Sequence, residues 1–170
     1  MRPGWMCAAL LLAGCRPALD DPDNIPRLGR WRDETVPIGI TMDDRGVPDG
    51  ELPGDFRDLL AKLDRVEEHC GEPYLRKQDE MERFLNQRFE GCRVERLDRD
   101  GPAVSGLASC APIMRSAGKA VTPAVRFDGM IGPDRLQLDM RMIQRLSLPT
   151  GSNHMLVISA RRMLRRIGDC

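Results

Sequence analysis

Aromatic residues are scarce in this 170-residue chain and make up 4% of it. The core must therefore be filled mainly by Leu, Ile, Val and the ten Met. An excess of either charge is also lacking, because 26 Lys and Arg balance 26 Asp and Glu. This balance removes the basic footprint that nucleic-acid binding requires over a whole domain, so we exclude nucleic acid as a partner. The length and the hydrophobic fraction of 41% are typical of one globular domain.

Long hydrophobic runs are missing as well. The first apolar stretch follows Arg2 and extends from Trp5 to Ala13, far below the roughly 20 residues that span a bilayer. It ends in Ala13 and Gly14, small residues of the kind that a signal peptidase accepts. The sequence therefore predicts a cleaved export signal over residues 1–14 rather than a transmembrane helix.

The tetrapeptide Leu12-Ala13-Gly14-Cys15 resembles the lipobox of bacterial lipoproteins. The resemblance implies that Cys15 is acylated and becomes the first residue of the mature protein, anchored in the membrane by several acyl chains. Because Arg16 follows instead of Asp, it further implies the periplasmic face of the outer membrane. An ordinary secretory signal with a chance cysteine is the alternative interpretation.

The mature chain is predicted to have two parts. Residues 15–28 are rich in Asp and Pro without periodicity, which predicts a flexible tether. Residues 29–170 then form a single α+β domain stapled by disulfides.

Four cysteines remain in the predicted domain, and in an oxidising envelope an even number predicts two disulfides. Cys92 and Cys110 lie nine residues to either side of Gly101, whose Asp-Gly pair is a hairpin turn signal. This spacing favours their pairing and leaves Cys70 for Cys170. Pairing in sequence order, Cys70 with Cys92 and Cys110 with Cys170, stays open. A zinc site is not predicted, since the sequence has no Cys-x-x-Cys.

Period-two alternation of apolar and polar residues predicts an antiparallel meander of about six strands. These strands cover 36–42, 94–97, 103–110, 121–130, 136–143 and 154–160. Apolar residues at helical spacing predict two helices inserted after the first strand. The first has Asp55 as its N-cap, apolar residues at helical spacing from Phe56 to Val66, and Gly71 as its stop signal. The second contains Met81, Phe84 and Leu85 and ends at Gly91. The expected fold is an α+β domain whose helices cover one face or end of the sheet.

Sparse anchors along the chain resemble a bacterial envelope family called domain of unknown function 3617. They are Gly29-x-Trp31, the cysteines at 70, 92 and 110, and the closing Arg165-Arg166-Ile167-Gly168-Asp169-Cys170. The resemblance implies an envelope location and supports the expected fold, but it brings no catalytic residues. The predicted helix before Cys70 and the aromatic-poor strands depart from the family pattern.

Catalytic and cofactor motifs are lacking. No serine lies in Gly-x-Ser-x-Gly, and only His69 and His154 could serve as a base. There is no Gly-x-x-x-x-Gly-Lys phosphate loop, and the acidic loop 43–51 does not match the spacing of a calcium loop. We therefore predict no catalytic residue, no cofactor and no metal.

One charged cluster precedes the final cysteine. It consists of Arg161, Arg162, Arg165 and Arg166. In a short helical turn these side chains would lie along one flank and bind anionic lipid headgroups or an anionic glycan. A solvated edge with arginine stems covering apolar surface is the alternative that we favour.

The sequence thus predicts a lipid-anchored envelope protein whose domain is a non-enzymatic binding or structural module, concentrated at a surface by its anchor. An envelope protein is another possible partner. One alternative is an inhibitor of a cell-wall hydrolase. The other is an enzyme, which a pocket collecting His69 or His154 with two carboxylates would favour.

Overall fold

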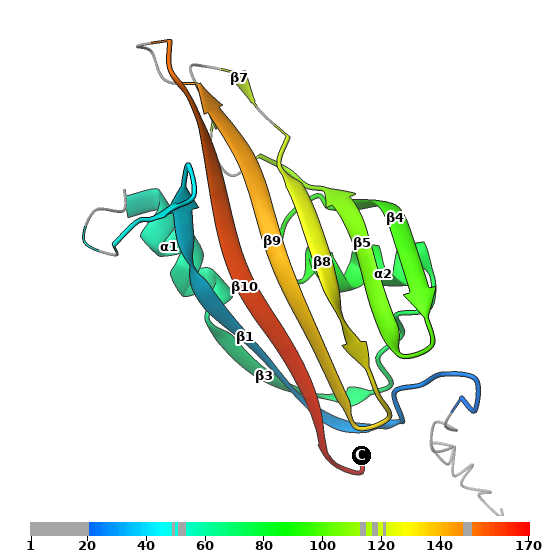
Figure 1. Cartoon of the computed structure of the whole chain (residues 1–170). Helices are drawn as coiled ribbons and strands as arrows, with labels where there is room; N and C mark the ends of the chain where they lie inside the picture. The colour runs from blue at the N-terminus through cyan, green and yellow to red at the C-terminus, as the bar shows by residue number, and fades with distance from the viewer. Residues whose placement is uncertain are drawn as a thin grey trace, which may run out of the picture.

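The computed structural model describes residues 21–48, 50, 54–112, 115–116, 119–120, 122–147 and 151–170. An eight-stranded antiparallel sheet dominates it, in the order β2-β1-β10-β9-β8-β5-β4, with β3 on the same edge of β1 as β2 (Figure 1). The strands are β1 (Gly29–Met42), β2 (Arg45–Gly46), β3 (Arg65–Gly71), β4 (Arg93–Asp100), β5 (Ala103–Ser109), β8 (Ala124–Ile131), β9 (Arg135–Ser147) and β10 (Asn153–Gly168). A separate hairpin contains β6 (Arg115–Ser116) and β7 (Lys119–Ala120).

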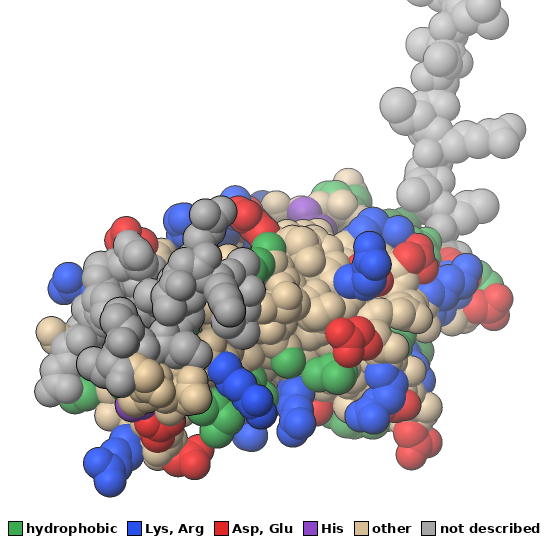
Figure 2. Space-filling view, turned by 90° about the horizontal axis from the view of Figure 1, so that it is seen from above, with side chains coloured by type: hydrophobic (Ala, Val, Ile, Leu, Met, Phe, Trp, Pro, Cys, Tyr) green, Lys and Arg blue, Asp and Glu red, His purple; other side chains and the backbone are tan. Residues whose placement is uncertain are grey.

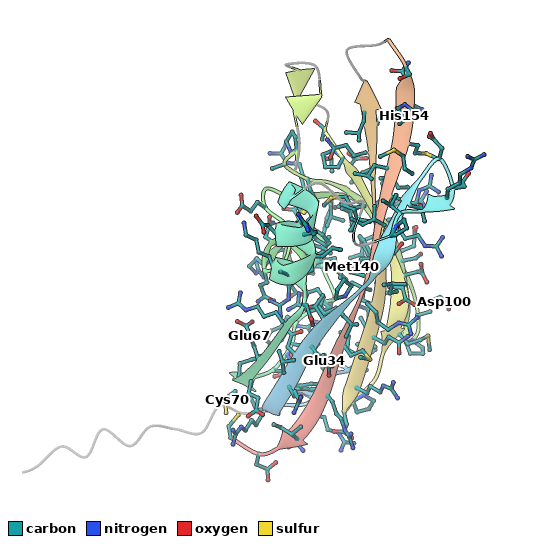
Figure 3. The ribbon with its side chains drawn as sticks, turned by 90° about the vertical axis from the view of Figure 1, so that its left-hand side faces the viewer. Glu34, Glu67, Cys70, Asp100, Met140 and His154 are labelled. Atoms are coloured by element: carbon teal, nitrogen blue, oxygen red, sulfur yellow. A yellow bond between two sulfur atoms is a disulfide. The ribbon has the colours of Figure 1, made fainter. Side chains whose placement is uncertain are left out.

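Both helices, α1 (Gly54–Leu63) and α2 (Gln78–Asn86), lie on one face of this sheet (Figures 1 and 3). In the longer strands of the sheet, alternate residues point at the helices and are buried, as Leu136, Leu138, Met140 and Met142 are on β9. These buried residues pack in one cluster with the apolar side of α2. The strands β2 and β3 have no buried residue. No element that the structure describes covers the other face, which we call the uncovered face.

The α+β class and the antiparallel sheet are confirmed, but the predicted strand count and the first helix are wrong. Residues 65–71 form β3, which pairs with β1 from Gly29 to Thr35. The helix ends at Leu63, which is fully buried. Val66, the next apolar residue at helical spacing, is 49% exposed and belongs to β3. A strand therefore separates the two helices.

The first strand is longer than predicted and contains a bulge. Its pairing with β10 shifts between Pro37 and Gly39, so Val36 and Ile38 are exposed whereas Ile40 is buried. Proline has no N–H to donate, and here it stands in the gap between the ends of β3 and β2 on that edge. Pro37 therefore lies at an edge of the sheet only locally, where neither β3 nor β2 pairs with β1.

The predicted tether does not extend to residue 28. Ile25 packs against the core, and the Asn24 side-chain amide donates to the carbonyls of Pro26 and Pro73, both at 3.0 Å. The indole N–H of the fully buried Trp31 donates to the Arg27 carbonyl at 3.1 Å. Residues 21–28 are therefore part of the domain, fastened by hydrogen bonds that composition alone does not reveal.

Candidate functional site

The structure joins Cys92 and Cys110 in a disulfide bond at the open end of the β4–β5 hairpin. This confirms the pairing expected from the turn at Gly101 and excludes the pairing in sequence order. Cys92 also connects the sheet to α2 through the side chain of Asn86. The Cys92 N–H donates to Asn86 Oδ1 at 2.7 Å, and the Asn86 amide donates to the Cys92 carbonyl at 2.9 Å.

The other two cysteines are exposed and unbonded, but the sheet brings them together. Cys70 lies opposite Arg30 on one side of β1, and Gly168 lies opposite the same residue on the other side. Cys170 follows two residues later. A hydrogen bond with the Cys170 thiol is the main cause that raises the pKa of the Cys70 thiol. Two thiols from distant parts of the sequence therefore meet at one end of the sheet.

The predicted arginine cluster lies on a strand and not on a helical turn, so it does not share one flank. Since β10 continues to Gly168, its side chains alternate between the two faces. Arg161 and Arg165 project from the uncovered face, whereas Arg162 and Arg166 point to the helix side. Arg161 forms an ion pair with Asp139.

Arg162 is instead the centre of a buried polar network. Its guanidinium pairs with Asp33 of β1, donates to the Phe84 carbonyl at 2.7 Å and stacks 3.6 Å above the Phe84 ring. Arg88 also reaches Asp33, at 3.1 Å, and donates to the Thr35 hydroxyl at 2.9 Å. Burial lowers the pKa of Arg162, and Asp33 opposes that effect. This arginine is committed to holding the domain together and is not accessible to an external anion.

The Arg166 guanidinium also has partners within the domain. It forms an ion pair with Asp169 and donates to the Leu28 carbonyl at 3.0 Å. Of the four predicted arginines, only Arg165 has no ion-pair partner among the described residues.

Three arginines stand side by side across the uncovered face. Arg165 of β10 lies directly opposite Arg32 of β1 and directly opposite Arg135 of β9. We call Arg32, Arg135 and Arg165 the arginine row. All three are exposed, and none has an ion-pair partner in the part of the chain that the structure describes. Glu68 lies opposite Arg32 but pairs with Arg30, at 2.5 Å. Like charges placed directly opposite in a sheet repel, so the row is unfavourable without an anion.

The arginine row lines a hollow of about 1220 Å³, which also includes Glu34, Asp134 and Met163. A second hollow of about 800 Å³ over β4, β5, β8 and β9 shares Arg135 with it. Figure 2 looks along the strands and shows Lys and Arg side chains in blue along its lower side, where the uncovered face lies.

The uncovered face is basic although the whole chain is neutral. Strand alternation assigns ten arginines to it, at positions 30, 32, 93, 96, 126, 135, 141, 145, 161 and 165. It assigns six carboxylates: Glu34, Glu68, Asp98, Asp100, Asp128 and Asp139. Ten against six leaves the paired strand positions of this face with four positive charges in excess; Glu95 in the β4 bulge and Asp134 before β9 lie outside this count. Composition could not show this asymmetry, because it averages both faces.

His154 lies at the opposite end of the sheet from Cys70 (Figure 3) and joins two other polar side chains. Its Nδ1 lies 2.7 Å from Asp43 Oδ2, and its Nε2 lies 3.1 Å from Ser152 Oγ. The Met155 N–H donates to the other carboxylate oxygen of Asp43 at 2.8 Å. The Met155 N–H is the main cause that lowers the pKa of Asp43, and His154 adds to it.

Asp43, His154 and Ser152 stand in the order carboxylate, imidazole, hydroxyl, which is also the order of a Ser-His-Asp catalytic triad. Here the carboxylate side chain is 50% exposed, and it fastens the start of β10 to the turn between β1 and β2. That turn explains the positive φ of Asp43 and Asp44, as a two-residue hairpin turn requires. His69 lies opposite Trp31 at the other end of the sheet.

Among the described residues, no group of three or more His, Cys, Asp or Glu is placed to hold a metal ion. Neither described helix has the length and apolar run that crossing a bilayer requires. The chain matches no protein-family model, no curated protein and no solved structure. The resemblance to domain of unknown function 3617 therefore stays a prediction.

Proposed function

We propose that this protein is a lipid-anchored envelope protein, held by Cys15 at the periplasmic face of the outer membrane, whose domain is a non-enzymatic binding module for anionic groups. The lipobox resemblance supports the anchor. The Cys92–Cys110 disulfide is consistent with an oxidising compartment. The uncovered face supplies the binding surface.

The arginine row is the observation that carries this proposal. Three directly opposed guanidiniums repel one another, and none of them forms an ion pair with a described carboxylate, although Glu34 and Asp134 line the same hollow. A phosphate-type anion in the hollow would remove that repulsion and accept charge-assisted hydrogen bonds from the planar guanidiniums. The ligand class that fits best is therefore a phosphate-bearing group.

A second disulfide, between Cys70 and Cys170, is part of the same proposal. The two thiols already meet across β1, and in the periplasm a thiol–disulfide oxidoreductase would accept the two electrons and two protons that bond formation releases. The bond would join β3 to the end of β10 beside the arginine row.

Titration with inorganic tripolyphosphate tests the binding surface. The variant Arg32→Ser/Arg135→Ser/Arg165→Ser is expected to bind this anion at least about tenfold more weakly than the unchanged chain, since one charge-assisted hydrogen bond contributes roughly 1.5 kcal/mol. Calorimetric titration at low ionic strength measures the difference.

The matched control is Arg57→Ser/Arg65→Ser/Arg83→Ser, which removes the same charge from exposed positions on α1, β3 and α2. It is expected to bind tripolyphosphate like the unchanged chain. Equal weakening by both triple variants would show a nonspecific charge effect and would overturn the proposed surface.

A further inference from the structure

The first described residues are fixed at one end of the sheet. The Asp21 carboxylate pairs with Arg76 at 3.0 Å, and its N–H donates to Glu72 at 3.3 Å. Glu72 directly follows β3, whose last residue lies opposite Gly29, the first residue of β1. The Arg27 N–H donates to Pro133, in the turn between β8 and β9. Figure 1 shows this segment in blue at the lower end of the sheet.

The arginine row lies at the same end. Arg32 is three residues into β1, Arg135 is the first residue of β9, and Arg165 is three residues before the end of β10. The exit point of the chain and the unpaired basic groups therefore lie at one end of the domain, whereas His154 marks the other end.

The chain between the predicted anchor and this end is short. Six residue steps separate Cys15 from Asp21, and a fully extended chain gains at most about 3.5 Å per residue. An acylated Cys15 would therefore keep Asp21 within roughly 20 Å of the lipid surface even with the chain fully extended. Any shorter separation would bring this end of the domain toward the Debye length of about 8 Å, within which the headgroups attract the arginine row.

We propose that the arginine row docks onto the phosphate headgroups of the membrane that holds the Cys15 lipid. The inference rests on the proposed function and names its ligand. Ile167, which is 44% exposed, follows the row along β10 on the same face, and Met163 precedes it. Both offer apolar contact beneath the headgroups, so the domain would lie with this end of its uncovered face toward the membrane.

Sedimentation with vesicles tests the docking. Every sample is the chain from residue 15 onward with Cys15→Ser, so that neither an acyl chain nor the apolar stretch from Trp5 to Ala13 contributes. Vesicles of phosphatidylcholine with phosphatidylglycerol are expected to bind it, vesicles of phosphatidylcholine alone are not, and added salt is expected to release it. Changing the arginine row to serine is expected to lower the partition coefficient on the order of a hundredfold, since each basic side chain near such a surface contributes about a factor of five. The triple variant at 57, 65 and 83 is expected to bind like the unchanged chain.

The possible outcomes distinguish a failure of the membrane docking from a failure of the proposed anion-binding function. Equal vesicle binding by the two triple variants would overturn the docking. Tripolyphosphate binding without vesicle binding would overturn it as well, but would leave a binding module for a soluble or glycan phosphate. Loss of both would overturn the docking and the proposed function together.

Discussion

Replacing Arg162 by methionine is expected to lower the free energy of unfolding by about 3 kcal/mol, because it leaves the buried Asp33 without its main partner. The same change removes the donor to the Phe84 carbonyl and the stacking on the Phe84 ring, which together fasten α2 to the sheet. Arg88 still reaches Asp33, which keeps the expected loss at the lower end of the range for a broken buried pair. Denaturant unfolding measures the change.

The neighbouring Arg161 supplies the matched control. It also pairs with an aspartate, but its side chain is 44% exposed on the uncovered face. Arg161→Met is therefore expected to change the free energy of unfolding by less than about 1 kcal/mol. A loss at Arg162 no larger than the loss at Arg161 would contradict the structural role assigned to the buried network.

Removing the proposed second disulfide is the other large expected effect. After oxidation, the chain is expected to lose about 4 kcal/mol of unfolding free energy in Cys70→Ser/Cys170→Ser, since the bond closes a ring of about a hundred residues. Each single variant is expected to unfold like the double variant, because either change prevents the bond. Cys92–Cys110 is unchanged in all of them, so the difference belongs to the second bond.

Alkylation without reductant provides the independent readout. The oxidised chain is expected to leave Cys70 and Cys170 unlabelled. Full labelling of both, together with unfolding midpoints that do not differ between the chain and its double variant, would show that the two exposed thiols stay free.

Local sequence signals predicted the features that depend on neighbouring residues. The Asp-Gly turn placed Cys92 beside Cys110, and the strict alternation from Leu136 to Met142 predicted the central strand β9. The strand β3 was missed because it lies at an edge and has exposed polar side chains. Its pairing with β1 depends on backbone hydrogen bonds, which leave no pattern of apolar residues.

The candidate site depends on register, which no single segment contains. Arg32, Arg135 and Arg165 belong to three strands and meet only because of how β1, β9 and β10 pair. The four arginines near the end of the sequence form a cluster only along the chain, within residues 161–166. Period-two alternation then divided them between the two faces and buried Arg162.

The most direct measurement of the central claim is the mass of the protein taken unreduced from the membrane fraction of cells that express the full chain. The account predicts a chain that begins at Cys15, carries acyl groups on that residue and retains its disulfides. A chain that keeps Met1, carries no lipid, remains outside the membrane fraction and is alkylated at every cysteine without reductant would contradict it.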